Sequence, residues 1–304
     1  MMIDNLRTFM RVIDERSISK AAEFEHITQS GITQMIRKME ADLGCELLIR
    51  SNKGIEPTES GALVYEYAKK ITDLDQSMKQ RLVCMTEGCY SIVIKPCCSL
   101  DNSIIPNILF NIQNKFSNIK MNIELEDKER ILNEVKSGVT DFGIFMGDMP
   151  EDNEVDITNV GVEHIVLIAG NQLIKQSSIT SKELSNYKVI DFSLGSYAAE
   201  VHAILSDLIY QDRFKKTYTP FFSIDSIPAI KSLVENNFGV SFIPLYSIQD
   251  DLNEGKFKIV NVENFKLTLP IRIVSKKDEN LPPFLKKIRQ YFIDSSKTYF
   301  KRHI

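Results

Sequence analysis

Glycine and proline are scarce in this sequence, and long hydrophobic runs are absent from it. The 304 residues include 13 glycines and 10 prolines, which is below average usage and excludes collagen-like and low-complexity chains. No stretch approaches 18 consecutive apolar residues, so we predict no membrane-spanning helix and no membrane partner. The N-terminal residues carry charge where a secretory signal needs an apolar run. We therefore expect a soluble, cytoplasmic protein.

An excess of positive charge is also absent. Lysine and arginine number 37 against 41 aspartate and glutamate residues, a formal charge of −4. A chain with this balance can bind nucleic acid only through a local basic patch. Hydrophobic residues make up 43% and charged residues 26%, which is typical of a globular protein with a substantial core and excludes intrinsic disorder. The length of 304 residues predicts about two domains.

Five cysteines do not form a disulfide framework in a cytosolic chain of this size. Four of them, Cys84, Cys89, Cys97 and Cys98, lie close together, but their spacing fits no standard zinc site. Two interpretations stay open. These residues are small apolar thiols in and near a pocket, or Cys97 and Cys98 sense thiol oxidants or soft metals at the mouth of a cleft.

Catalytic constellations are missing as well. The four histidines are scattered along the chain, and no glycine-rich phosphate loop, nucleophile elbow or His-Glu-x-x-His motif occurs. The sequence therefore predicts no enzyme activity, no cofactor and no metal site.

The first forty residues have the apolar spacing of three successive helices. Leu6, Phe9, Met10 and Ile13 recur at helical steps over residues 4–15, which indicates an amphipathic helix. A short second helix is expected over 20–24, after a turn and cap at 16–19. Thr28 can cap a third helix over 29–40, which completes a helix-turn-helix arrangement. The polar face of this third helix carries side chains that can hydrogen-bond base edges in a major groove: Gln29, Ser30, Thr33, Gln34 and Arg37.

The segments 43–50 and 51–58 are predicted to form strand, turn and strand, a wing with Arg50 and Lys53 near its tip. Residues 1–90 carry 12 basic and 14 acidic residues, so the basic signal is confined to the third helix and the wing. A small helical domain that binds another protein is the alternative. We predict that double-stranded DNA is the partner, with three residues reading bases (Gln29, Thr33, Gln34), three holding mainly phosphates (Arg37, Arg50, Lys53) and further contacts from Ser19, Thr28 and Ser30.

Residues 4–65 resemble the winged helix-turn-helix of the LysR-type transcriptional regulators, with no gap in the spacing. The first departure is Ser30-Gly31-Ile32, where the family commonly has Pro-Ala-Leu, and the second is Leu47-Leu48-Ile49-Arg50, where it has Leu-Phe-Glu-Arg. A glycine within a helix costs about 1 kcal/mol relative to alanine. The runs that carry the resemblance are Leu6-Arg7-Thr8-Phe9, Ser17-Ile18-Ser19-Lys20-Ala21-Ala22-Glu23, Ile27-Thr28-Gln29-Ser30-Gly31-Ile32-Thr33, Ile36-Arg37-Lys38-Met39-Glu40, Leu43-Gly44 and Pro57-Thr58-Glu59-Ser60-Gly61.

A long helix is predicted after the wing, with Thr58 as its N-cap and Gly88 beyond its end. Its apolar residues recur at steps of three and four, as in a coiled-coil seam. The stripe packs on the C-terminal part of its own chain or on a second copy. The resemblance implies the second choice, a homodimer or homotetramer whose linker helices pair. The stripe consists of Val64, Tyr67, Ile71, Leu74, Met78, Leu82 and Met85.

The remaining residues alternate between strands and helices, which predicts a parallel sheet. This region resembles the effector-binding part of the same family, shaped like a periplasmic binding protein, with two α/β subdomains joined by two crossover strands. The motifs Asp141-Phe142-Gly143-Ile144, 225–234 and 239–244 carry that resemblance. Strands are expected at 90–94, 121–126, 141–145, 164–168, 189–192, 221–224, 239–244 and 269–274, and helices at 104–116, 129–137, 198–212, 227–236 and 283–299.

A ligand in such a fold lies at the carboxyl ends of strands, where helix N-termini offer unpaired amides. Family members that bind small anions often carry hydroxyls at four of these positions, and this chain replaces two of them with Cys97 and Met146. A soft or larger effector is therefore favoured over a sulfate-like anion, with Lys95 as the one cation evident nearby. Any of these residues can also be mere packing. The predicted effector residues are Cys97, Cys98, Ser99, Met146, Ser196 and Ser226.

The predicted fold class is α/β, with a winged helix-turn-helix over 1–58, a linker helix over 59–88 and an effector-binding domain over 89–304. Subdomain I is expected over about 90–161 and 268–304, and subdomain II over about 162–267. The predicted function is a ligand-responsive, DNA-binding transcriptional regulator that senses an unidentified small molecule. The alternatives are a thiol- or metal-responsive regulator of the same fold and a solute-binding protein. A solute-binding protein is disfavoured because a signal peptide is missing and because a helix-turn-helix is present.

Overall fold

The computed structural model describes residues 3–51, 54–97, 104–149, 151–192, 198–210 and 219–302. The chain divides into two compact units, residues 1–90 and 91–304, which are considered separately.

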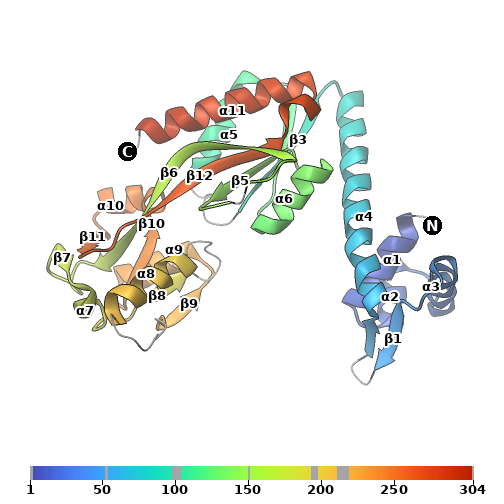
Figure 1. Cartoon of the computed structure of the whole chain (residues 1–304), viewed down its shortest axis with the longest axis horizontal. Helices are drawn as coiled ribbons and strands as arrows, with labels where there is room; N and C mark the ends of the chain where they lie inside the picture. The colour runs from blue at the N-terminus through green and yellow to red at the C-terminus, as the bar shows by residue number, and fades with distance from the viewer. Residues whose placement is uncertain are drawn as a thin grey trace. The chain divides into compact units, whose positions relative to one another are not determined.

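The first unit begins with three helices, α1 (Ile3–Asp14), α2 (Ile18–Glu25) and α3 (Gln29–Leu43) (Figure 1). The second helix starts two residues earlier than predicted, because the Ser17 hydroxyl accepts the Lys20 N–H and serves as the N-cap. His26, in the left-handed region with φ of 55°, ends this helix. Thr28 caps α3 as predicted, and its side chain accepts the Gly31 N–H.

The wing consists of β1 (Leu48–Ser51) and β2 (Gly54–Pro57), paired antiparallel. Its second strand is held against the turn after α1, because the Ile55 N–H donates to the Arg16 carbonyl over 3.0 Å. Gly54 has φ of +108°, and a Cβ there would lie 2.6 Å from the same carbonyl oxygen. Only glycine allows this strand to approach the turn so closely.

The long helix α4 (Glu59–Thr86) is capped by Thr58, whose hydroxyl accepts the Gly61 N–H over 2.9 Å. It packs on α1, where the buried Asp75 carboxylate accepts from Arg7 over 2.8 Å. The apolar residues of the helix are instead largely exposed. In the predicted stripe only Val64 is half-buried, while Leu74 is 46% and Leu82 53% exposed. This helix therefore buries Thr72, Asp75 and Ser77 beside the small Ala68 and Cys84, and presents most of its large apolar side chains to solvent.

The second unit is built on a mixed sheet in the order β4-β3-β5-β12-β6-β11-β7, with β10 also paired to β6. Figure 1 shows β6 (Val155–Gly170) and β12 (Leu267–Lys276) as two long strands side by side. The other bounds are β3 Tyr90–Pro96, β4 Ile119–Ile123, β5 Phe142–Met146, β7 Ser178–Ile179, β8 Ile190–Phe192, β9 Phe222–Ile224, β10 Val240–Pro244 and β11 Phe257–Val262.

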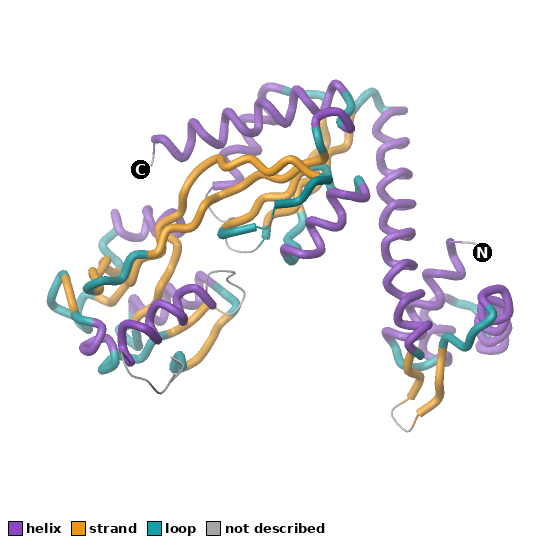
Figure 2. Tube along the Cα trace, in the orientation of Figure 1, coloured by secondary structure: helices purple, strands orange, loops and turns teal. Residues whose placement is uncertain are grey.

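Helices cover both faces of this sheet (Figure 2). Helices α5 (Ile104–Lys115) and α11 (Pro283–Arg302) contribute Ile112 and Phe292 to the main hydrophobic core. Helix α6 (Lys128–Ser137) contributes Ile131 to a separate cluster on the other face. The remaining helices are α7 Ser181–Leu184, α8 Ala198–Tyr210, α9 Ile227–Glu235 and α10 Gln249–Asn253, with single 3-10 turns η2 Leu245–Ile248 and η3 Asp278–Asn280.

The sheet differs from the sequence prediction in direction. Strands β3 and β5 are parallel, as are β8 and β9, but β12 runs antiparallel to both β5 and β6. The two long strands, β6 and β12, carry the chain in opposite directions between the halves of this unit. Neither of them can therefore be parallel to all of its neighbours. The prediction also found only part of β6, placed β4 two residues late, and did not include β11.

Candidate nucleic-acid interface and effector residues

The polar face of α3 is available to a partner. Gln29, Ser30, Gln34 and Arg37 are exposed and Thr33 is half-buried, whereas Ile32, Ile36 and Met39 on the opposite side belong to the core of the first unit. Because these polar residues are spaced by about one or two turns, they lie on one side of the helix. The predicted base-reading side chains are therefore brought together, and Ser19 is exposed on the neighbouring helix α2.

Several hydroxyls of this face are already engaged within the helix. The Thr28 oxygen accepts from the Gly31 N–H over 3.1 Å and from the Ser30 hydroxyl over 3.2 Å. The Thr33 hydroxyl donates to the Gln29 carbonyl over 2.9 Å. The Thr33 oxygen keeps its lone pairs for a further donor, whereas the Thr28 oxygen accepts twice and keeps only its O–H to donate. Thr28 thus has a structural part, the capping of α3, beside the DNA contact predicted for it.

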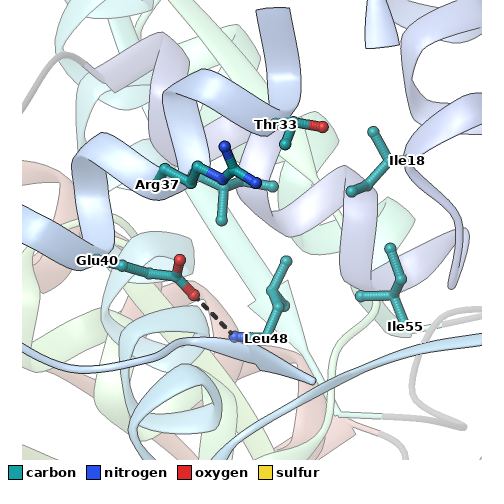
Figure 3. A pocket seen from close by; sticks show the side chains of 7 residues that line it. Ile18, Thr33, Arg37, Glu40, Leu48 and Ile55 are labelled. Carbon is teal, nitrogen blue, oxygen red and sulfur yellow. Dashed lines mark hydrogen bonds between the residues drawn. The ribbon is translucent and has the colours of Figure 1, made fainter. Parts of the chain in front are cut away.

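A pocket of about 310 Å³ lies between α3 and the wing. Figure 3 shows Thr33, Arg37 and Glu40 on α3, with Leu48 and Ile55 contributed by the wing and Ile18 by the start of α2. The Glu40 carboxylate accepts the N–H groups of Leu47 over 2.8 Å and Leu48 over 3.4 Å. This carboxylate therefore ties the first strand of the wing to α3.

The wing tip is only partly described. Arg50 lies on β1, but its side chain and the whole of Lys53 are outside the described residues. Their predicted phosphate contacts stay predictions.

Two predicted effector residues follow neighbouring parallel strands but belong to different hydrophobic clusters. Cys97 comes directly after β3, is 3% exposed and packs with Ile131 and Phe145. Met146 ends β5, is 1% exposed and belongs to the main core. The surroundings of the Cys97 thiol match the packing interpretation that the sequence left open.

The other predicted effector residues are mostly outside the described residues, namely Cys98, Ser99 and Ser196. Ser226 is described: it is half-buried and caps α9, and its hydroxyl accepts the Ala229 N–H over 3.4 Å. The structure therefore does not test whether these six residues meet around one ligand.

Lys95, the cation expected near these strand ends, is paired with two carboxylates. The Lys95 ammonium is buried and donates to Glu134 over 2.8 Å and to Glu124 over 3.2 Å. Burial on its own would lower the pKa of Lys95, but these two carboxylates outweigh it and raise the pKa. A different cation lies beside the end of β5, because Arg272 donates to the Gly147 carbonyl over 3.3 Å and to Asp148 over 3.0 Å.

Sequence reasoning also missed two acidic groups at these strand ends. The Asp191 carboxylate on β8 lies 2.8 Å from His202 Nε2 on α8, and burial raises the pKa of Asp191 against the opposing effect of that histidine. Glu200 Oε1 lies 3.9 Å from the place a Cβ would take at Gly147. Only the pairing of distant segments brings these groups together, so no local signal in the sequence could have found them.

Two family descriptions match most of the chain. Residues 93–297 match the LysR substrate binding domain, and residues 3–62 match the bacterial regulatory helix-turn-helix protein of the lysR family. The chain belongs to the LysR family. This LysR-type chain is a DNA-binding transcriptional regulator with an effector-binding domain and is not an enzyme, which confirms the resemblance, the fold class and the general function predicted from the sequence.

Individual relatives are distant but similar over nearly their full length. The HTH-type transcriptional regulator CysL of Bacillus subtilis is 26% identical over 274 residues, 88% of each chain. The crystal structure of CbnR, a LysR family transcriptional regulator, has a TM-score of 0.75 at 18% identity and covers 98% of this chain and 100% of its own. The structure of full-length CbnR with its target DNA has a TM-score of 0.73 at 17% identity, with coverage of 97% and 100%.

Two further properties of this LysR-family chain concern its described residues only. Among them, no helix has the length and apolar character needed to cross a membrane. Within the same ranges, no three histidine, cysteine or acidic side chains gather closely enough to hold a metal ion.

Proposed function

We propose that this regulator binds double-stranded DNA with α3 in the major groove and the wing beside it. The observation that carries the proposal is the exposed polar face of α3, which lies on a helix fixed by its cap and its buried apolar side. Gln29, Thr33 and Gln34 then contact base edges, with Ser30 beside them. Phosphates are held by Arg37, Arg50 and Lys53, and Ser19 and Thr28 add contacts at the edge of the interface.

The regulator acts as a homodimer or homotetramer in this proposal, joined through α4. Tyr67, Ile71 and Met78 are between 42% and 57% exposed in the single chain, and an apolar stripe of this length on one helix is typical of a coiled-coil seam. Pairing of two such helices would hold two DNA-reading heads at a defined spacing. Double-stranded DNA is the expected target, and the proposed location is the cytoplasm.

The effector is proposed to be a small molecule at the carboxyl ends of β3, β5, β8 and β9. The residues proposed to contact it are Cys97, Cys98, Ser99, Met146, Ser196 and Ser226. The charged groups found there support a ligand with both a donor and an acceptor group. Arg272 lies beside Gly147 from one strand, and the Glu200 carboxylate approaches it from α8. Oxidant or metal sensing through Cys97 and Cys98 is less supported, because Cys97 is only 3% exposed.

The DNA-reading roles are tested by comparing Gln29→Ala with Lys53→Ala in a selection from random duplexes. Loss of a base contact should relax the preference at one position of the selected site and cost about 1–3 kcal/mol there. Loss of a phosphate contact should weaken binding to all sequences alike and reduce the salt slope by about one contact. If Gln29→Ala selects the same sequences as the wild type with the same stringency, α3 does not read bases as proposed.

A further inference from the structure

The pocket between α3 and the wing has two chemically different walls. Four aliphatic side chains line it, with Ile18 and Ile36 buried and Leu48 and Ile55 half-buried. On the α3 side, Arg37 and Thr33 contribute polar groups to its lining (Figure 3). A volume of about 310 Å³ is at the lower end of the range for small-ligand sites, so the pocket admits a fragment of a larger partner.

The polar groups of this pocket point to an anion. The Arg37 guanidinium is exposed and has no hydrogen bond or ion pair with any described residue. The one acid in the lining, Glu40, already accepts two N–H groups of the wing. Ile18 is the first residue of α2, so its N–H group is one of those that a helix leaves unpaired at its N-terminus. An anion with an apolar neighbour fits this combination of groups.

Duplex geometry says which anion that is. In B-DNA a single sugar-phosphate strand separates the major groove from the minor groove. If α3 lies in the major groove and the wing at the adjacent minor groove, that strand runs between them. We propose that this pocket seats one deoxyribose phosphate of the operator, with the sugar carbons on the aliphatic wall and the phosphate on Arg37.

This proposal rests on the proposed placement of α3 in the major groove, and it adds a contact that α3 alone does not supply. The sugar carries most of the C–H surface of the DNA backbone, which matches Ile18, Leu48 and Ile55. Glu40 has a positioning role here, because its two hydrogen bonds to Leu47 and Leu48 fix how far the wing wall stands from Arg37. The contact is the same for every base, so it contributes affinity and register and no sequence preference.

The first test fills the pocket. Ile55→Trp places a large ring on the aliphatic wall, and Ile49→Trp is the matched control, because Ile49 lies on the same wing, is 45% exposed and does not line the pocket. Binding of the full-length regulator to a selected operator and to unrelated duplex is measured by fluorescence anisotropy. We expect Ile55→Trp to weaken both by about tenfold or more, with the loss of about one phosphate contact from the salt slope, and the control to bind like the wild type.

A second test does not depend on how well that variant folds. Single methylphosphonate substitutions, which remove the charge of one phosphate, are scanned along the operator. One position in each half-site should weaken wild-type binding by about tenfold and should have no effect on Arg37→Gln. A wild type that selects no DNA would refute the proposed function itself. If the wild type binds DNA but no single methylphosphonate weakens its binding while leaving that of Arg37→Gln unchanged, then the pocket does not bind a deoxyribose phosphate, and the proposed function itself still stands.

Discussion

Glu163 makes the stability of the second unit depend on pH in an unusual direction. It lies on β6 opposite Leu269, just before the segment of β6 that pairs with β10. The side chain is 1% exposed. One carboxyl oxygen accepts the N–H groups of His164 over 2.9 Å and Tyr246 over 3.4 Å, while the other has no hydrogen-bond partner among the described residues.

Burial raises the pKa of Glu163 from 4.5 to about 8, against the lowering effect of the backbone N–H groups. The titratable groups packed around it do not offer compensation. They are the phenols of Tyr246 and Tyr299, whose pKa values are raised first by burial and further by the negative charge of Glu163. Asp250 is a further acid that acts on Tyr299. At neutral pH the folded protein therefore keeps a proton that the unfolded chain releases.

The sign of the effect follows from this difference in bound protons. Between pH 4.5 and about 8 the folded state binds more protons than the unfolded state, so stability falls as pH rises and levels off above the folded pKa. Each pH unit within this window changes the free energy of unfolding by about 1.4 kcal/mol. Between pH 6 and pH 9 the loss from this group alone is about 2.5 kcal/mol, and the melting temperature falls by about 5–10 °C.

Glu163→Gln is the matched variant, because an amide keeps the acceptor oxygen for His164 and Tyr246 but carries no titrating proton. Urea unfolding followed by circular dichroism at pH 6, 7, 8 and 9 measures both proteins. We expect the stability of the variant relative to the wild type to rise by about 2.5 kcal/mol across this series. Parallel pH profiles for the two proteins would refute the reasoning, since the remaining titrating groups are common to both.

Three further predictions concern the seam, the effector and a close backbone contact. Leu74→Asp places a charge in the proposed intersubunit seam, which is strongly unfavourable, so sedimentation should show loss of the oligomer. Gln76→Asp, at an exposed polar position, should keep the oligomer. An unchanged Leu74→Asp oligomer would mean that α4 does not pair. Ser196→Trp should leave operator binding intact but abolish the response to a compound that shifts it in the wild type; a normal response at the same concentration would place the effector elsewhere. Gly61→Ala should destabilise the first unit by about 2 kcal/mol or more in urea unfolding, because the added Cβ would lie 1.9 Å from the Leu47 carbonyl oxygen. Gly31→Ala is the control, since its new Cβ meets only the Thr28 hydroxyl at 3.1 Å. Equal stabilities of the two variants would contradict the clash.

The first unit could be predicted closely from the sequence because its signals are local. Thr28 and Thr58 cap α3 and α4 where the sequence placed them, and the apolar spacing of α1 predicts its bounds within a residue at each end. Leu6 and Phe9 are buried as that spacing implies, whereas Met10 and Ile13 are half-buried and Val12 is buried in addition. The cap expected within 16–19 is Ser17, and α2 begins before the predicted residue 20 because the choice between Ser17 and Ser19 depends on the backbone conformation. The strand, turn and strand of the wing were also predicted, since its two strands are neighbours in the chain. The predicted start at residue 43 was wrong, because α3 continues to Leu43 and β1 begins only at Leu48.

The second unit was less predictable because its contacts join distant segments. The first half of β6 pairs with β12 from Val155↔Lys276 onward. The partner of a strand over 155–163 is therefore far away in the sequence, and a local sequence pattern does not reveal it. Arg272 reaches Gly147 for the same reason, through the pairing of β12 with β5. Glu163 is charged in the sequence and looks like a surface residue, and only the packing of η2 and α11 against β6 buries it. Such features depend on register, which a single sequence does not contain.

The two long strands limit the kind of motion that an effector could drive in the second unit. Strands β6 and β12 pair continuously from Val155↔Lys276 to Ile165↔Leu267, with a single irregularity between Ile271 and Arg272. Sliding one strand past the other would break this whole ladder at once and would turn inward-facing side chains outward. A change of twist would keep the ladder, and a bulge is where the local twist of a strand can change most readily. Signals in this domain are therefore expected to travel as a rotation about the paired strands, with Arg272 and its contact to Gly147 at the pivot.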